Sequence, residues 1–220
     1  MIKIYGREEV PVNVTDNMAA IILAAGSSFR MKEFRPLMKL GNVTAIEHAV
    51  RCFYYAGIND IRIVLGYNAL DVIETLRYYV VRFIFNRRFH EEMFSSVREG
   101  IATLEPEIRA FFVMPADNPL VSVKTVYTML ERFHAPDQPD IVYPSFNNRR
   151  GHPPLISARL KMDIYNSSSP GGLREVLRNF ESGAVDVAVD DEAVLLDMNV
   201  PDDYHRLLKY LKYQDAAEYK

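Results

Sequence analysis

The strongest constraint on the fold is an uninterrupted apolar run, Ala19 to Ala25, which ends at Gly26, Ser27 and Ser28. A short run of this kind, closed by small polar residues, is typical of a strand that is buried on both faces. Such strands belong to parallel sheets that are covered by helices. The run therefore predicts the first strand of an α/β sheet.

Strand-like and helix-like segments alternate after that run. Apolar positions recur with helical period from Thr44 to Ala56, and Gly57 stands where a C-terminal cap belongs. The same patterns predict strands at 61–65, 82–85, 110–114 and 141–143, and helices at 69–79, from a Ser95 cap to about 104, and at 123–133. Short connections between such units imply right-handed crossovers, so we expect an α/β three-layer αβα sandwich with a mostly parallel sheet.

The pattern is less regular beyond residue 145. Short apolar runs lie at 155–156, 185–189 and 194–196, and helices are predicted near 173–180 and 201–213. We expect this part to complete the sheet edge and a pocket wall. With 220 residues, the chain fits a single domain over residues 18–220, preceded by an arm or linker at residues 1–17.

Composition excludes several classes of protein. The formal net charge of −3 gives no overall attraction to nucleic acid or to anionic membranes. Cys52 is the only cysteine, which excludes an intrachain disulfide and a multi-cysteine metal site. The N-terminal residues lack the apolar core of a secretory signal, and no apolar run is long enough to span a bilayer. We therefore expect a cytoplasmic protein.

The loop after the first predicted strand carries the first candidate site. It reads Leu23-Ala24-Ala25-Gly26-Ser27-Ser28-Phe29-Arg30-Met31. Its small residues let backbone N–H groups approach an anion closely, and Arg30 adds positive charge. The loop lacks both the Walker A pattern and the three-glycine dinucleotide pattern. It is either a phosphate cradle or an ordinary turn with a surface arginine.

A second candidate follows the strand at 110–114. Pro115 cannot donate to a sheet ladder, so pairing should stop there and leave Asp117 at the mouth of the sheet. Ligands of open α/β sheets bind at this edge, and Mg²⁺ prefers carboxylate oxygen together with substrate phosphates. The alternative is that Asp117 or Asn118 caps the next helix.

Two further polar clusters lie later in the chain. Arg150, Gly151 and His152 belong to a stiff basic segment that suits an anionic second substrate, with a solvated basic turn as the alternative. Asp197 ends a predicted strand and offers a second metal ligand. Against that, acidic residues before a helix are commonly caps, as Asp202 and Asp203 after Pro201 indicate.

Four motifs in order and spacing resemble one family. They are LAAGSSFRM, PADNPL, RRGHPPL and VLLDMNVPDDY, and the similarity extends from about Ala19 to Leu208. The sequence resembles the MobA-like nucleotidyltransferase superfamily, and within it the molybdenum cofactor cytidylyltransferase branch. This resemblance implies a Rossmann-like fold of the nucleotide-diphospho-sugar transferase type. It also implies a Mg²⁺-dependent enzyme that joins a nucleoside triphosphate to a phosphate-bearing acceptor and releases pyrophosphate.

The resemblance also implies roles for individual residues. Arg30, Arg35 and Asp117 would be catalytic, Asp117 and Asp197 would bind the metal, and Arg150, Gly151 and His152 would contact the acceptor. The nucleotide-binding residues would be Leu23, Ala24, Ala25, Gly26, Ser27, Ser28, Ser95 and Ser96. A molybdoenzyme or a cofactor-insertion protein would be the natural partner.

The chain also departs from the family pattern. Lys32 stands where the family has Gly, Arg35 where it has Lys, Asn118 where Gln or Met is common, and Asn199 where Asp is common. Arginine keeps the charge of lysine but replaces a compact ammonium with a planar fork. These changes leave room for a non-catalytic carrier of nucleotide or cofactor.

The first loop bears on the choice of nucleotide. Leu-Ala-Ala-Gly at residues 23–26 resembles the cytidylyl branch, whereas guanylyl relatives have Leu-Ala-Gly-Gly, so CTP is favoured. Molybdopterin or its molybdenum-loaded form is the expected acceptor. A sugar phosphate or polyol phosphate is the alternative, since one fold supports many acceptors.

Overall fold

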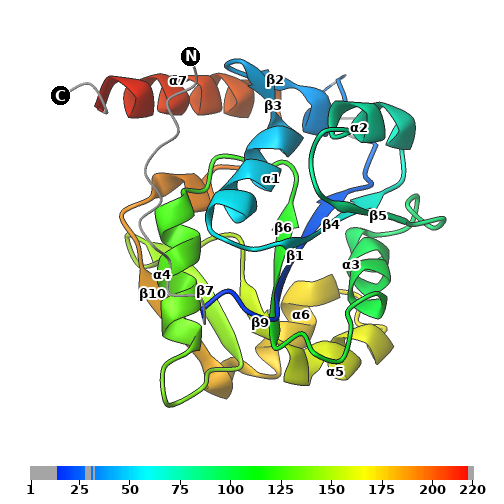
Figure 1. Cartoon of the computed structure of the whole chain (residues 1–220), viewed down its shortest axis with the longest axis vertical. Helices are drawn as coiled ribbons and strands as arrows, with labels where there is room; N and C mark the ends of the chain where they lie inside the picture. The colour runs from blue at the N-terminus through cyan, green and yellow to red at the C-terminus, as the bar shows by residue number, and fades with distance from the viewer. Residues whose placement is uncertain (1–13, 28–30, 32, 218–220) are drawn as a thin grey trace.

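The computed structural model describes residues 14–27, 31 and 33–217, and its central element is an eight-stranded sheet (Figure 1). The strand order is β10-β7-β9-β6-β1-β4-β5, and β8 pairs with β7. The strands are β1 (Met18–Ala24), β4 (Asp60–Leu65), β5 (Arg82–Phe85), β6 (Ala110–Pro115), β7 (Ile141–Phe146), β8 (Arg149–Arg150), β9 (Leu155–Ser157) and β10 (Ala184–Ala188). A separate short hairpin joins β2 (Lys39–Leu40) to β3 (Val43–Thr44).

Strand directions make the sheet mixed. β1 runs parallel to both of its neighbours, β4 and β6, and the β4–β5 and β7–β10 pairs are also parallel. β9 is antiparallel to both β6 and β7. The chain moves outward from β1 through β4 to β5 and then returns to the other side of β1 with β6. The strand order therefore reverses between β1 and β6, and ligands of open α/β sheets bind at such a point.

Helices cover both faces of the sheet, which confirms the predicted three-layer sandwich (Figure 1). One core cluster joins alternate residues of β1 to α1 (Ala45–Tyr55), α2 (Ala69–Thr75) and α4 (Val123–Phe133). The other cluster joins the remaining β1 residues to α3 (Met93–Ala102), α5 (Lys161–Asn166) and α6 (Gly172–Arg178). All of β1 is buried, as its continuous apolar sequence predicts. The last helix, α7 (Pro201–Ala217), packs beside β2 and β3.

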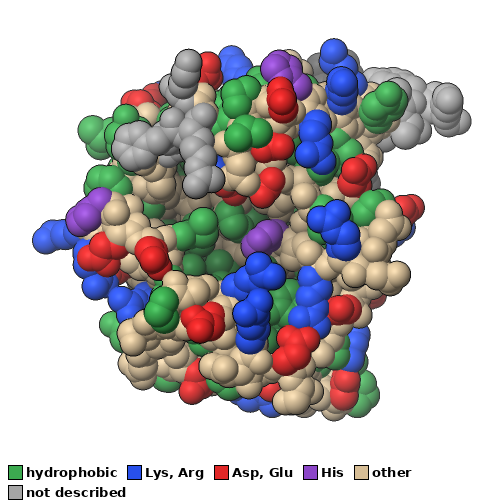
Figure 2. All heavy atoms as spheres, turned by 180° about the vertical axis from the view of Figure 1, so that it is seen from behind, with side chains coloured by type: hydrophobic (Ala, Val, Ile, Leu, Met, Phe, Trp, Pro, Cys, Tyr) green, Lys and Arg blue, Asp and Glu red, His purple; other side chains and the backbone are tan. Residues whose placement is uncertain are grey.

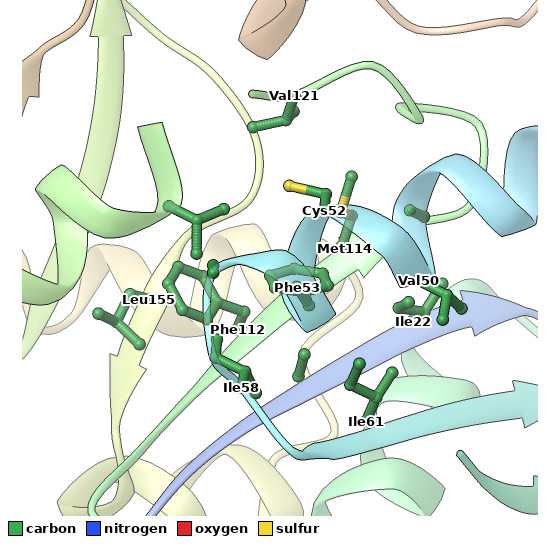
Figure 3. Close-up of a cluster of buried hydrophobic side chains, with 14 of the residues drawn as sticks. Ile22, Val50, Cys52, Phe53, Ile58, Ile61, Phe112, Met114, Val121 and Leu155 are labelled. Carbon is green, nitrogen blue, oxygen red and sulfur yellow. The ribbon is translucent and has the colours of Figure 1, made fainter. Parts of the chain in front are cut away.

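The larger cluster shows how apolar patterning fixes α1 on the sheet (Figure 3). Phe53 of α1 packs against Phe112 of β6, with ring centroids 5.3 Å apart. Thr44 caps this helix, because its side chain accepts from the Glu47 backbone N–H while the Glu47 carboxylate accepts from the Thr44 N–H. Gly57 has φ +86, so the predicted glycine at the helix end does adopt the left-handed conformation.

Three local predictions are wrong. α3 begins at Met93 with Glu92 as its N-cap, because the Ser95 hydroxyl is engaged by Asn86 instead of capping the helix. The predicted strand at 194–196 is a 3₁₀-helix, Glu192–Leu195, because the buried Asp191 carboxylate accepts from the Ala193 N–H and starts a helical turn. Finally, α2 ends at Thr75 and not at residue 79.

The early end of α2 has a visible cause. Tyr79 turns back toward α1, where its hydroxyl donates to Glu47 at 3.0 Å and accepts from Arg51 at 2.9 Å. This arrangement draws the chain out of helical geometry before it enters β5.

Only the end of the predicted arm at residues 1–17 lies within the described residues. Val14 packs on the core, and its carbonyl lies 3.0 Å from Nε2 of His134. We propose that residues 18–220 form one domain. Residues 14–17 would then be the end of the preceding segment, which packs on this domain. Among the residues that the structure describes, no helix has both the length and the apolar character that a membrane crossing needs.

Close packing of α3 on the sheet predicts a large effect at Gly100. A Cβ there would lie 2.5 Å from Ile21 Cγ2 and 3.2 Å from Val64 Cγ2, both on stiff β-branched side chains of the central strands. We expect Gly100→Ala to lower the free energy of unfolding by roughly 1–3 kcal/mol, measured by urea denaturation, although alanine normally favours helix. Gly26→Ala is the control, because no atom lies within 4 Å of its Cβ position. Equal stability of the two variants would contradict this account of the packing.

Candidate functional site

The ends of β1 and β6 border a small cavity of about 120 Å³. Leu23 pairs with Pro115 in the parallel register, and the Ala116 N–H donates to the Leu23 carbonyl at 3.0 Å. The residues that follow each strand, Gly26 and Asp117, line this same cavity. The structure therefore brings the two predicted loops together at the reversal point of the sheet.

The first loop presents its backbone to the cavity. Ala24, Ala25 and Gly26 line it, and the Ala25 carbonyl accepts from the Tyr67 N–H at 3.0 Å. Gly26 is exposed and has no atom within 4 Å of its Cβ position. An anion can therefore approach the main chain closely here. Ser27 is half-buried, whereas Ser28 and Arg30 lie outside the described residues.

Arg35 joins three segments that are distant in the sequence. Its Nη1 donates to Asp117 Oδ2 at 2.6 Å, to the Met198 carbonyl at 3.1 Å and to Asn199 Oδ1 at 2.8 Å. The side chains of Arg35 and Asp117 are 21% and 16% exposed, so the ion pair is shielded from bulk water yet reachable from the cavity. Two positions at which the chain departs from the family pattern, Arg35 and Asn199, thus contact each other.

The charges around Asp117 shift its pKa. Burial raises the pKa of this carboxyl above its ordinary value and Asp197 acts in the same direction, while Arg35 and His152 oppose the shift. His152 is open to solvent on one side, yet removal of water by the surrounding protein lowers the pKa of its imidazole.

Asp197 lies close enough to influence Asp117 but is exposed. Its Oδ2 accepts from Asn199 Nδ2 at 2.7 Å, and the Met198 N–H donates to the Asp117 carbonyl at 2.8 Å. Within the described part of the chain, no three His, Cys, Asp or Glu side chains form a group suited to a metal ion. The predicted metal pair thus consists of two carboxylates near each other, with no third protein ligand of these types.

The sequence left open whether Asp117 or Asn118 caps the following helix. α4 is capped by Ser122, whose hydroxyl accepts from the Thr125 N–H, so neither Asp117 nor Asn118 is the cap. Asn118 is buried, and its Nδ2 donates to the carbonyls of Ala193 and Leu196. It therefore fixes the segment that leads to Asp197. Sequence gave no signal for this role, because a buried asparagine has no periodic signature.

The two serines of α3 are held inside the protein. Asn86 Nδ2 donates to Ser95 Oγ at 2.8 Å and to Ser96 Oγ at 2.9 Å, and the Ser95 hydroxyl donates to the Arg88 carbonyl. Ser96 also lines the small cavity, whereas Ser95 lines neither cavity described here. The pair fastens the loop between β5 and α3, and only Ser96 lies where it could meet a ligand.

A larger cavity of about 940 Å³ adjoins the small one, since Leu23, Met93 and Pro115 line both. Figure 2 looks onto a hollow with a hydrophobic floor, a histidine at its margin and basic side chains along one rim. Gly151 and His152 line the larger cavity. A Cβ at Gly151 would lie 2.2 Å from the Val194 carbonyl oxygen, so only glycine permits this close approach.

Arg150 also lines the larger cavity, but it is already engaged. Its Nε lies 2.6 Å from Asp186 and its Nη2 lies 2.7 Å from Glu181, and the guanidinium stacks 4.5 Å above the Tyr143 ring. Two other arginines of this cavity, Arg174 and Arg178, were missed by the sequence interpretation. Their spacing of four residues on a helix was the available signal.

The sequence of the chain is similar to known proteins over most of its length. The sequence profile of the MobA-like NTP transferase domain matches residues 20–186. Nicotine blue oxidoreductase of Paenarthrobacter nicotinovorans is 28% identical over 198 residues, which cover 87% of this chain and 96% of that protein.

Solved structures share the fold. A nucleotidyl transferase from Methanothermobacter thermautotroptrophicus superimposes with a TM-score of 0.77 at 22% identity, covering 90% of this chain and 98% of that one. The manganese complex of Rv0371C from Mycobacterium tuberculosis gives 0.73 at 22% identity, covering 87% and 98%. The fold class predicted from the sequence is therefore confirmed.

Proposed function

Since the chain belongs to the MobA-like NTP transferase family, we propose that it transfers CMP from CTP to the phosphate of molybdopterin or its molybdenum-loaded form and releases pyrophosphate. The single observation that carries this proposal is the shared cavity of the Gly26 loop and Asp117 at the reversal point of the sheet. The preference for CTP rests on the Leu-Ala-Ala-Gly sequence of that loop.

The residues at this site fit a divalent cation. Burial raises the pKa of Asp117 and the neighbouring Asp197 adds to the shift, and a cation beside the two carboxylates would favour their charged forms. Mg²⁺ is commonly held by one or two carboxylates together with substrate phosphates, so a third protein ligand is not required. When bound, the metal supplies charge neutralisation at the α-phosphate. That a solved structure of the same fold is a manganese complex supports this assignment.

The protein's own residues then have a limited task. The acceptor phosphate is ionised at neutral pH and needs no general base, so positioning and charge stabilisation account for the catalysis. The open backbone around Gly26 binds the triphosphate. Arg35, held by Asp117 and Asn199, stabilises the departing pyrophosphate. His152 borders the acceptor side.

A pyrophosphate-release assay tests the proposal. The protein, Mg²⁺ and CTP are combined with molybdopterin, its molybdenum-loaded form or a sugar phosphate, and each reaction is repeated with GTP and ATP. We expect release only with CTP and a molybdopterin species. Release only with a sugar or polyol phosphate would reassign the acceptor. Tight nucleotide binding without release, unaffected by Asp117→Asn, would identify a non-catalytic carrier.

A second candidate is an oxidoreductase, favoured by the relative of that name that aligns over most of the chain. In this chain Arg35 already forms an ion pair with Asp117, and an oxidoreductase would need no metal ion to neutralise that carboxylate. The test measures NADH and NADPH oxidation with a quinonoid dye as electron acceptor. Turnover that is insensitive to Mg²⁺ and to Asp117→Asn would favour this candidate over nucleotidyl transfer.

A further inference from the structure

The larger cavity carries two arginines without a role in the reaction described above. Arg174 and Arg178 both line it from α6, and both are exposed. Within the described residues neither forms an ion pair with a carboxylate, in contrast to Arg150, which is bound by Glu181 and Asp186. Two guanidinium groups four residues apart on one helix face the same region.

The surroundings of these arginines are mainly apolar. Met93, Phe94, Leu173 and Leu177 line the same cavity. Phe94 and Leu177 are 8% and 3% exposed, so they form a fixed wall and not a mobile surface. A site with an apolar wall and two cations suits a ligand that has a flat ring, whose faces pack on apolar side chains, at one part and an anionic group at another. A sugar phosphate would leave its hydroxyl groups facing apolar side chains.

The arginine pair also lies apart from the reacting centre. Asp117 lines the small cavity, whereas both arginines line only the larger one. Two carboxylates line the same cavity: Glu181 is paired with Arg150, and Glu92 forms no ion pair with Arg174 or Arg178 among the described residues. The positive charge of Arg174 and Arg178 is therefore available to a ligand.

Resting on the proposed function, we infer that Arg174 and Arg178 determine acceptor specificity by binding an anionic group other than the attacking phosphate, at the part of the acceptor remote from Asp117. The apolar wall holds the ring system between the two ends. Both arginines are binding residues, so their loss raises KM for the acceptor without changing kcat at saturation.

Direct binding to the full chain tests this inference without relying on activity. The first probe is naphthyl phosphate, which joins an apolar ring to a phosphate. The second is glucose phosphate, which joins a polar sugar to a phosphate. Isothermal titration calorimetry measures the affinity of the chain for each. We expect naphthyl phosphate to bind more tightly than glucose phosphate. We expect its Kd to rise about tenfold or more in the Arg174→Ala/Arg178→Ala double variant, which is the loss expected for charge-assisted hydrogen bonds. The Arg174→Lys/Arg178→Lys variant retains most of the affinity.

Controls separate this inference from the proposed function. Arg77→Ala removes an exposed arginine that lines neither cavity, and it should leave naphthyl phosphate binding unchanged. CTP binding with Mg²⁺ should be the same in the wild type and the double variant. The inference would be overturned if the wild type and the double variant bound naphthyl phosphate equally well, or if the wild type did not bind it. Complete displacement of the probe by CTP would also overturn it. Failure of CTP to bind the wild type, with the arginine effect intact, would instead count against nucleotidyl transfer alone.

Discussion

Asp117→Asn is expected to lower pyrophosphate release roughly a hundredfold or more, because it removes the negative charge at the meeting point of the two loops. Asparagine keeps the size of the side chain and can still accept a hydrogen bond from Arg35, which donates to Asp117 at 2.6 Å. The folded state should therefore be nearly as stable as the wild type. Steady-state kinetics together with thermal melts measure both effects.

The matched control for this variant is Asp137→Asn. Asp137 also pairs with an arginine, Arg132, at 2.6 Å, but it lies on an exposed surface away from both cavities. We expect Asp137→Asn to leave turnover unchanged, because Asp137 lines neither cavity. Its stability should also change little, because exposed ion pairs contribute little to stability. If Asp117→Asn melted far below Asp137→Asn and lost activity only in proportion to unfolding, Asp117 would be a structural residue.

Arg35→Ala is the second large effect, with turnover expected to fall by about tenfold to a hundredfold. The change removes positive charge beside the departing pyrophosphate. It also removes the shared donor that holds Asp117 and Asn199 together. Arg35→Lys should recover part of the activity, because it restores the charge but not the shape of the guanidinium, whose Nη1 contacts Asp117 and Asn199. Turnover and the Mg²⁺ concentration at half-maximal rate are measured for each variant.

Arg51→Ala serves as the comparison for Arg35. Arg51 is likewise part of a side-chain network, with Tyr79 and Glu47, but lines neither cavity. It should leave turnover unchanged. The opposite result is also informative: higher activity at lower Mg²⁺ in Arg35→Ala would show that the arginine competes with the metal for Asp117 and does not assist the reaction.

Local sequence patterns are sufficient to predict the layers of the fold and the place of Asp117 after a strand. Burial on both faces of a strand leaves a continuous apolar run, and burial of one helix face leaves a helical period, so local pattern is sufficient to predict β1 and α1. Pro115 likewise marks the end of β6, which places Asp117 in the loop beyond the sheet. These features depend on neighbouring residues and so can be inferred without knowing the fold.

The contacts between polar groups, by contrast, depend on how distant parts of the chain pack together. Arg35 contacts Asp117 across 82 positions and Asn199 across 164, and no local pattern records such distances. The antiparallel insertion of β9 between β6 and β7 and the alignment of Arg174 and Arg178 along one cavity also follow from how distant elements pack. The physical reason is that apolar burial is averaged over many neighbours and leaves a periodic trace, whereas an ion pair or hydrogen bond depends on one partner whose position is set by the whole fold.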